Sequence, residues 1–197
     1  MLTTTIRTGV PIQHWAQCIA EITAGGFAAD DVQDYMFENP ISLESLAPYT
    51  FFSSKSYTRN LIFKTDVLEC LVLCWDIGQS TCVHNHDQKT GWMYVADGRL
   101  FVQNYRLAER DEARRIGRLV PTEATELDSR HGACVDKEQA LHRVSNLASY
   151  QQRAISVHVT HQAVTECEVY SLQQGTYEVK KLSRTSEFGR LNPGVEL

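Results

Sequence analysis

Two histidines one residue apart are the first residues in this chain whose types and spacing could do metal chemistry. His84 and His86 stand in the stretch "GQSTCVHNHDQKTGWMYVADGRLFV", between apolar runs that alternate as strands do. Side chains two residues apart on a strand point to one face of a sheet. The two imidazoles can therefore converge on a single ion, although a His-x-His pair by itself also arises by chance.

A third histidine, His142, lies in "ALHRVSN", a later stretch that is also predicted to be a strand. Three neutral imidazoles on one side of an ion leave adjacent coordination positions open, which suits a redox or Lewis-acid catalyst better than a closed structural site. His84, His86 and His142 are therefore candidate metal ligands. His14 and His131 are expected to be exposed to solvent and dispensable.

The elements that must position these side chains read as a helical lead-in followed by an all-β sandwich or barrel. Residues 11–38 carry apolar side chains at helical spacing, and a second helix is expected to begin near Asp30–Asp31 and end before Pro40. From about Tyr57 short apolar runs such as "LECLVLCW" and "AISVHV" are separated by turn residues. The polar stretch 108–131 is expected to include a loop excursion between strands.

Length and composition describe an ordinary soluble globular protein. A chain of 197 residues, 43% hydrophobic and 22% charged, is most simply one domain with a sizeable core. A formal net charge of -5 without a basic run argues against a nucleic-acid partner. No signal-peptide core and no segment of membrane-spanning length is present, so we expect no membrane contact. We also expect a monomer or weak homo-oligomer.

The six cysteines show no Cys-x-x-Cys spacing, and a domain of this size does not need disulfides. They are therefore interpreted as reduced thiols in a cytoplasmic protein. Cys70 and Cys74 lie in the apolar run "VLECLVLCW" and are expected to be small core residues.

The spacing around the three histidines resembles the two motifs of the cupin family. Gly78 precedes His84 by six residues, Gly98 follows His86 by twelve, and a later His-x3-Asn ends at Asn146. His142 closes the second motif, so we expect His84, His86 and His142 to be the metal ligands. The resemblance also implies a cupin β-barrel, also called a double-stranded β-helix or jelly roll. A single domain would then cover residues 1–197, with a helical lead-in over 1–44 and the barrel over 45–190.

One residue departs from the cupin motif. Where the first motif carries an acidic ligand, this chain has Gly91, which cannot bind a metal. The implied site is thus a neutral three-histidine site, and an anionic substrate atom such as a thiolate is electrostatically favoured on a ferrous ion there.

Within the cupins, five ordered stretches resemble the cysteine dioxygenases: "YTRNLI", "LCW", the His-x-His pair, "LHRVSN" and "SVH", between about residues 45 and 170. This resemblance implies a mononuclear non-heme Fe(II) thiol dioxygenase. L-cysteine would bind the iron through thiolate and amine, O2 would take the remaining position, and both oxygen atoms would be added to sulfur to give cysteine sulfinate.

The resemblance also assigns the substrate-binding residues. Arg59 matches the arginine that holds the substrate carboxylate, and a guanidinium offers a planar, permanently charged, bidentate partner for that group. Members that prefer 3-mercaptopropionate commonly carry glutamine here, so Arg59 favours an α-amino acid. Tyr57 and Trp75 match aromatic residues in or near the pocket, although either could equally be barrel core.

The oxygen side of the implied site is altered. The family has a Ser-x-His-x-Tyr chain beside the iron; Ser156 and His158 are present, but the tyrosine position is Thr160. Alternation puts Ser156, His158 and Thr160 on one strand face and His161 on the other. We expect the first two to form a hydrogen-bonded relay, with a buried structural histidine as the alternative.

Thr160 leaves two outcomes open. The enzyme makes cysteine sulfinate, or it is a specialised thiol oxygenase that acts on another small thiol carboxylate or takes cysteine to a different product, as some cupins of natural-product pathways do. A remote alternative is a non-catalytic cupin that only binds a ligand. A zinc, nickel or manganese isomerase is disfavoured because most of those enzymes keep the acidic ligand.

Overall fold

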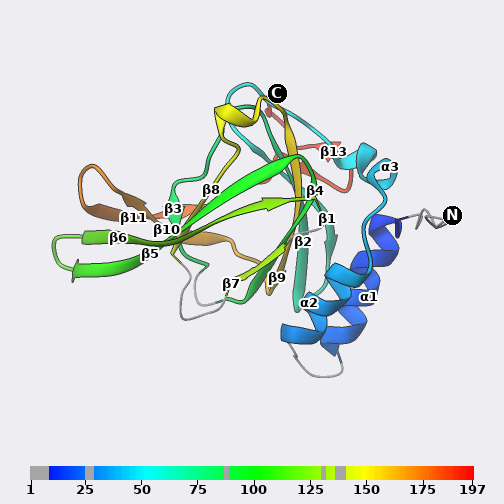
Figure 1. Cartoon of the computed structure of the whole chain (residues 1–197), viewed down its shortest axis with the longest axis horizontal. Coiled ribbons are helices and arrows are strands. Elements are labelled where there is room, and N and C mark those ends of the chain that lie inside the picture. Colours follow the sequence, from blue (N-terminus) through cyan, green and yellow to red (C-terminus); the bar gives the residue numbers. More distant parts are fainter. Residues whose placement is uncertain (1–8, 25–28, 87–88, 130–131, 136–140) are drawn as a thin grey trace, which may run out of the picture.

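The chain folds into two facing β-sheets with helices packed on the outside of one of them, as Figure 1 shows. The structure is a computed structural model, and it describes residues 9–24, 29–86, 89–129 and 141–197 together with the backbone of 132–135. The sequence-based expectation for His131 therefore lies outside the described residues. The two sheets form a double-stranded β-helix, which confirms the predicted all-β fold class with an N-terminal helical segment.

Three helices precede the strands: α1 (Ile12–Ala24), α2 (Ala29–Glu38) and the short α3 (Leu43–Leu46). Trp15 and Ile19 on α1 and Val32 on α2 are fully buried, so both helices present one apolar face to the sheet beneath. The two helices and the end of α2 before Pro40 are as predicted. Among the described helices none is long and apolar enough to cross a membrane.

The first sheet has seven strands, which are hydrogen-bonded in the order β13-β12-β1-β2-β9-β4-β7. Its strands are β1 (Thr58–Lys64), β2 (Leu68–Trp75), β4 (Gly91–Asp97), β7 (Gly132–Val135), β9 (Ala154–His161), β12 (Ser186–Glu187) and β13 (Arg190–Leu191). In this sheet β9 lies between β2 and β4 and is antiparallel to both.

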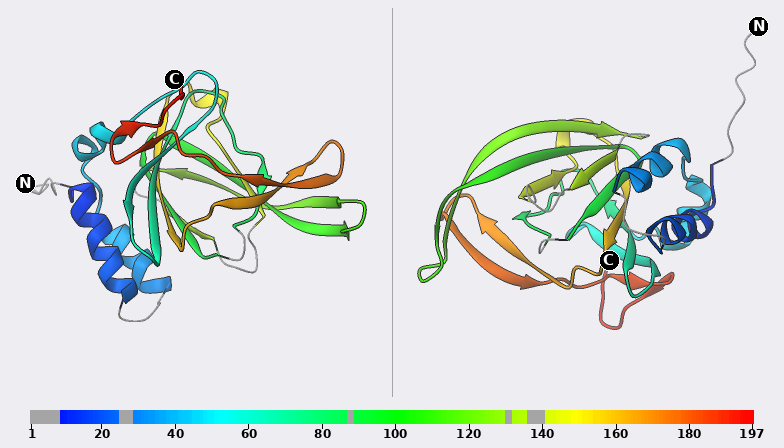
Figure 2. Two further views of the ribbon diagram at one scale, coloured as in Figure 1. Left: turned by 180° about the vertical axis from the view of Figure 1, so that it is seen from behind. Right: turned by 90° about the horizontal axis from the view of Figure 1, so that it is seen from below.

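The second sheet has six strands in the order β10-β11-β6-β5-β8-β3, and it closes because β3 also pairs with β10. Its strands are β3 (Val83–His84), β5 (Arg99–Asp111), β6 (Ile116–Asp128), β8 (His142–Ser145), β10 (Glu166–Ser171) and β11 (Thr176–Lys181). The views in Figure 2 show this sheet wrapping round the interior, opposite the first sheet.

Strand β2 explains how the interior is divided, because all eight of its residues are buried. Cys70, Val72 and Cys74 pack with the helices, whereas Leu71 and Leu73 belong to a second cluster between the sheets. A strand covered on both faces is expected to be continuously apolar. The prediction that Cys70 and Cys74 are small core residues is confirmed, and burial raises the pKa of Cys74 to about 11.

The expectation of a loop excursion over 108–131 is wrong. Strands β5 and β6 form one long hairpin whose pairing runs from Arg99–Asp128 to Asp111–Ile116. Its distal half projects beyond the barrel at the side where β10 and β11 turn (Figure 1). Because most of its residues are exposed, this half shows little of the apolar alternation that marks a half-buried strand, and it carries charged cross-strand pairs such as Arg118–Glu109 (3.3 Å).

Candidate metal centre

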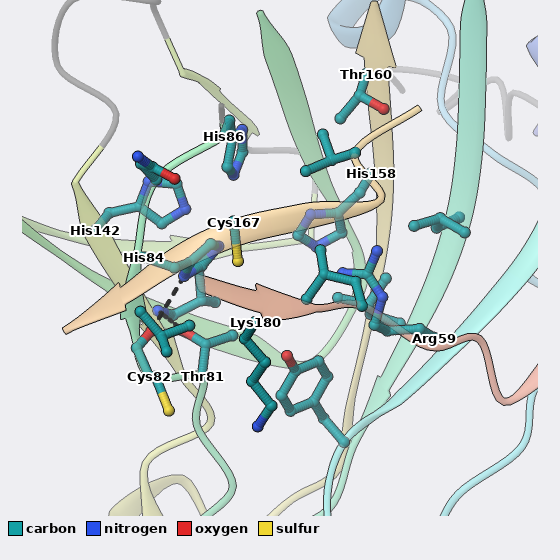
Figure 3. A pocket seen from close by; sticks show the side chains of 18 of the residues that line it. Arg59, Thr81, Cys82, His84, His86, His142, His158, Thr160, Cys167 and Lys180 are labelled. Carbon is teal, nitrogen blue, oxygen red and sulfur yellow. Dashed lines mark hydrogen bonds between the residues drawn. The ribbon is translucent and has the colours of Figure 1, made fainter. Parts of the chain in front are cut away.

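A cavity of about 110 Å³ lies between the two sheets. Side chains from β1, β2 and β9 line one wall, and side chains from β3, β8, β10 and β11 line the other (Figure 3). Of the residues proposed from sequence, the cavity brings together these seven: Tyr57, Arg59, His84, His86, His142, His158 and Thr160.

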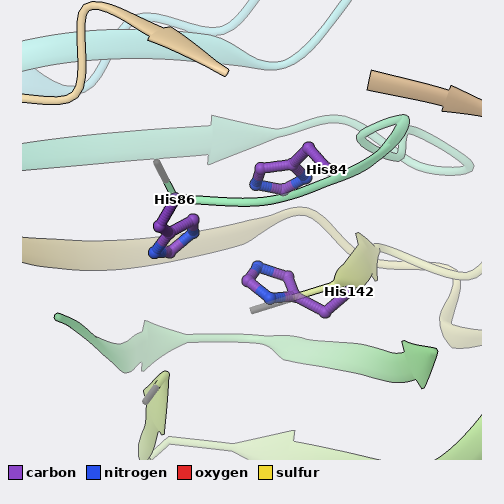
Figure 4. A group of neighbouring side chains, drawn as sticks. All are labelled: His84, His86 and His142. Carbon is purple, nitrogen blue, oxygen red and sulfur yellow. The ribbon is translucent and has the colours of Figure 1, made fainter. Parts of the chain in front are cut away.

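His84, His86 and His142 converge on one point, as Figure 4 shows, and their nearest ring nitrogens all lie within 4.8 Å of one another. His84 in β3 is the direct cross-strand partner of His142 in β8. The strand expected to carry both residues of the His-x-His pair ends at His84, and His86 follows in the next segment. The rings are nevertheless close: the ring centroids of His84 and His142 are 4.7 Å apart, and those of His86 and His142 are 4.8 Å apart.

The protonation of these rings suits a metal. Burial lowers the pKa of His84 to about 4 and holds the pKa values of His86 and His142 well below the usual value. All three rings are therefore neutral at pH 7, which is the form of imidazole that binds a metal. His84 Nδ1 lies 3.1 Å from the carbonyl oxygen of Cys82, which can only accept, so Nδ1 carries the proton and Nε2 keeps its lone pair.

Gly91 fits this three-nitrogen site for a steric reason. A Cβ built on Gly91 would lie 3.0 Å from Nδ1 and 3.2 Å from Cε1 of His86, closer than ordinary contacts. A side chain at position 91 would require the His86 ring to shift by a few tenths of an ångström. The donor set is thus three neutral imidazoles, a composition that suits divalent transition metals such as Fe(II).

Arg59 in β1 lies across the cavity from the histidines (Figure 3). Its Nε is buried and has no hydrogen-bond partner among the described residues. Its backbone, by contrast, is fixed: the Arg59 amide donates to Thr185 Oγ1 (3.0 Å), and the Thr185 amide donates to the Arg59 carbonyl (2.7 Å). A buried guanidinium nitrogen without a partner is costly, and an anionic ligand in the cavity would compensate it.

Trp75 does not line the cavity but supports it from behind. The Trp75 ring is fully buried and stacks on Tyr57 with centroids 4.6 Å apart, and its Nε1–H donates to Ser156 Oγ (2.9 Å). Ser156 Oγ also lies 2.9 Å from His158 Nε2. Because an indole N–H only donates, the Ser156 hydroxyl proton is available to His158 Nε2, and the His158 proton then lies on Nδ1.

His158 is neutral in this environment. Burial lowers its pKa to about 3, and the nearby Arg59 cation lowers it further. Strand β9 places Ser156, His158 and Thr160 on its inner face, while Val157 and Val159 pack with the helices. The shared face predicted from alternation is therefore present.

Thr160 lies next to Gly91 in the sheet register, and both residues adjoin the His86 ring. Its side chain is buried, and Oγ1 has no hydrogen-bond partner in the described part of the chain. Thr160, Gly91 and His86 also line a second cavity of about 20 Å³ behind the histidines, enough for one water molecule.

Sequence reasoning missed several wall residues. Glu69 is fully buried beside the cavity and forms an ion pair with Arg184, which compensates the charge of its carboxylate. Cys167 and Lys180 face each other across β10 and β11 and also line the cavity. Cys167 and Lys180 lie outside the stretches that resemble a motif, so only the paired strands bring them to the site. His14 is exposed, as expected.

The fold and these residues define a cupin-type barrel whose three inner histidines form a candidate site for one metal ion. The family model for cysteine dioxygenase type I matches residues 3–173 of the chain. The protein therefore belongs to the cysteine dioxygenase type I family.

Individual relatives are distant. The chain is 22% identical over 165 residues to cysteine dioxygenase type 1 of Danio rerio, covering 83% of this chain and 80% of that protein. It is 24% identical over 148 residues to the Rattus norvegicus protein of the same name, covering 75% and 72%. A Klebsiella pneumoniae structure with a double-stranded β-helix domain is 16% identical, with a TM-score of 0.46, and covers 70% of this chain and 96% of that one. Family membership and the three-histidine cluster together support a thiol dioxygenase.

Proposed function

We propose that this protein is an Fe(II)-dependent thiol dioxygenase that oxidises L-cysteine with O2 to cysteine sulfinate. The proposal is carried by two features that face each other across one cavity: three neutral histidines, and the buried Nε of Arg59, which has no hydrogen-bond partner among the described residues. That pairing fits a ligand with a thiolate at one end and a carboxylate at the other.

His84, His86 and His142 would hold the iron, and the fit rests on their neutral, convergent nitrogens. When bound, the iron would supply open coordination positions for a thiolate and O2 together with the redox chemistry that joins them. No added reductant is required, because one O2 supplies both oxygen atoms of the sulfinate and cysteine supplies the electrons.

Arg59 would bind and orient the substrate. Its guanidinium can form a bidentate, charge-assisted pair with the carboxylate, which fixes the direction in which the rest of the molecule points. A thiol held at both ends is restricted to orientations near the reactive one. The apolar side chains of Leu71, Leu73 and Val144 exclude bulk water from the same space.

His158 would control a proton beside the reacting groups. Ser156 occupies Nε2, so the Nδ1–H is the proton that the ring can offer. Because Trp75 donates a hydrogen bond to Ser156, the Ser156 hydroxyl is fixed, and the His158 ring bonded to it has one preferred orientation. We therefore assign His158 as a donor to bound substrate or oxygen, with Ser156 and Trp75 as its supports.

The direct test is O2 consumption by the Fe(II)-loaded protein with L-cysteine, compared with 3-mercaptopropionate and cysteamine. We expect one O2 consumed per sulfinate formed, with both atoms of ¹⁸O-labelled O2 in the product, and slow reaction with the two comparison thiols. Iron-loaded protein that consumes no O2 with L-cysteine would refute the proposed substrate.

A second candidate function, a specialised thiol oxygenase, is suggested by Thr160. Its short side chain and the small cavity behind it leave space beside His86, which could accept a bulkier thiol carboxylate or allow a different oxidised product. If the space only holds water, Thr160→Tyr should raise the rate of sulfinate formation and leave the product unchanged. If the space defines another reaction, the substitution should suppress the native product in favour of the sulfinate, which mass spectrometry would detect.

A further inference from the structure

A second polar cluster lies at the root of the projecting hairpins and is centred on Glu168 in β10; it borders the cavity through Asn85, which lines it. The Glu168 side chain is 20% exposed and lies between Asn85 and Arg110. Asn85 is the residue between His84 and His86, so this cluster borders the candidate metal ligands directly.

Asn85 and Glu168 are joined by three hydrogen bonds. The Asn85 amide donates to the Glu168 carbonyl (3.2 Å), and the Glu168 amide donates to Asn85 Oδ1 (3.0 Å). In addition, Asn85 Nδ2 donates to Glu168 Oε2 (3.2 Å). The side chain of Asn85 thus continues the pairing of β3 with β10 past the point where strand β3 ends at His84.

Glu168 is itself held by the hairpin formed by β5 and β6. Arg110 donates from Nη2 to Glu168 Oε1 (2.8 Å) and from Nη1 to Oε2 (3.1 Å), and the Tyr170 hydroxyl donates to Oε2 (2.6 Å). The Arg110 guanidinium lies over the Tyr177 ring, 4.6 Å from its centroid. This fork geometry fixes the carboxylate more tightly than a single-point ion pair would.

Gly117 in β6 allows this packing. A Cβ at position 117 would lie 2.7 Å from Cε1 of Tyr170 and 3.0 Å from Cδ1 of Tyr177. The two rings therefore sit directly on the glycine backbone, and they stack with centroids 5.5 Å apart. The hairpin of β5 and β6 is in this way packed against β10, the strand whose Glu168 is hydrogen-bonded to Asn85.

We propose that Glu168 and Asn85 are positioning residues for the metal centre, and that Arg110 acts on it through Glu168. The clamp fixes the segment between His84 and His86, so that both rings face His142 before a metal binds. Pre-orientation of ligands by outer hydrogen bonds contributes roughly 10–100-fold to metal affinity. The inference rests on the metal centre of the proposed function, but on neither its substrate nor its product.

The test measures Co²⁺ affinity by chelator competition in the absence of thiol and O2, together with the visible absorption of bound Co²⁺ and the melting temperature of the metal-free protein. Asn85→Ala and Glu168→Ala should each raise the dissociation constant roughly 10–100-fold. Glu168→Gln, which keeps an oxygen acceptor and the side-chain shape, should restore part of the loss. Arg110→Ala should weaken binding in the same direction.

Arg118→Ala is the matched control, because Arg118 lies on the same hairpin and pairs with Glu109 rather than Glu168. Its Co²⁺ affinity should stay within about twofold of the parent, inside the scatter expected of an exposed ion pair. A purely structural role would lower the melting temperature of the Asn85 and Glu168 variants and leave their Co²⁺ affinity and spectrum unchanged, which would overturn the inference. A parent protein that binds no Co²⁺ would overturn the metal centre and this inference together, whereas Co²⁺ binding without thiol oxidation would refute only the substrate.

Discussion

Replacing Arg59 with alanine tests the substrate assignment most directly. The substitution removes a guanidinium whose Nε is buried and unpartnered among the described residues, while both backbone hydrogen bonds to Thr185 remain possible. We therefore expect the variant to fold and to keep its metal, and to lose affinity and orientation for a substrate carboxylate.

The size of the loss follows from the two hydrogen bonds that a guanidinium can give to one carboxylate. A hydrogen bond to a charged group contributes about 1.5–3 kcal/mol, so two at the lower value contribute about 3 kcal/mol. Since about 1.4 kcal/mol corresponds to a factor of ten, kcat/KM for L-cysteine should fall on the order of 100-fold. A loss confined to KM would mean uniform binding, and a fall in kcat as well would mean that orientation is also lost.

Cysteamine provides the control because it keeps the thiol and amine and lacks the carboxylate. O2 consumption should be measured for the parent, Arg59→Ala and Arg59→Lys, each with both thiols. With L-cysteine, the loss of kcat/KM should be large for Arg59→Ala and intermediate for Arg59→Lys. With cysteamine, both variants should lose almost nothing. Equal losses on both thiols, or equal turnover of both by the parent, would refute the role of Arg59 in carboxylate binding.

Three further outcomes are expected. Changing any one of the proposed ligands His84, His86 and His142 to alanine should abolish stoichiometric iron binding, measured by metal analysis; full occupancy in all three variants would refute the centre. His158→Gln and Trp75→Phe should slow turnover and alter its pH profile while iron content stays unchanged, whereas an unaltered rate and profile would favour a structural role. The Arg110 cation and the Tyr170 hydroxyl hold the pKa of Glu168 below its usual value. The interaction of ionised Glu168 with Arg110 therefore stabilises the fold above about pH 4.3, and this contribution is lost as the pH falls through the lowered pKa. Urea unfolding should therefore show Glu168→Gln about 1 kcal/mol less stable than the parent at pH 7, with the difference shrinking at pH 3.

The barrel and the histidine centre could be predicted because their signals are local. Strand β2 reads as a continuous apolar run since both of its faces are covered, and alternation in β9 assigns His158 and Thr160 to the inner face. His84 and His86 are two residues apart, so any extended segment directs them to the same side. The resemblance to known motifs then added His142 and Arg59, which no local pattern could have connected to them.

The rest could not be predicted because it depends on contacts between distant strands. Residues 108–128 are rich in charge and mostly exposed, yet they belong to a hairpin, and its Gly117 packs against the rings of Tyr170 and Tyr177 from another hairpin. The clamp between Asn85 and Glu168 likewise joins positions 83 residues apart. A polar side chain in a sequence gives no indication of which distant polar side chain it will meet.

The departures at positions 91 and 160 are linked by the same geometry. Gly91 in β4 and Thr160 in β9 are direct register partners, and a Cβ on Gly91 would lie 3.4 Å from Cγ2 of Thr160 and 3.0 Å from Nδ1 of His86. The volume beside His86 is therefore shared between the two positions, and a larger residue at either one uses space that the other leaves open. Because position 91 has no side chain, the His86 ring can lie against it. Because the side chain of Thr160 is short, the cavity of about 20 Å³ beside His86 stays open. Because Gly91 leaves that space free on one side, we expect any effect of position 160 on the proposed reaction to act through the volume and the hydroxyl group next to His86, with the three histidines unchanged.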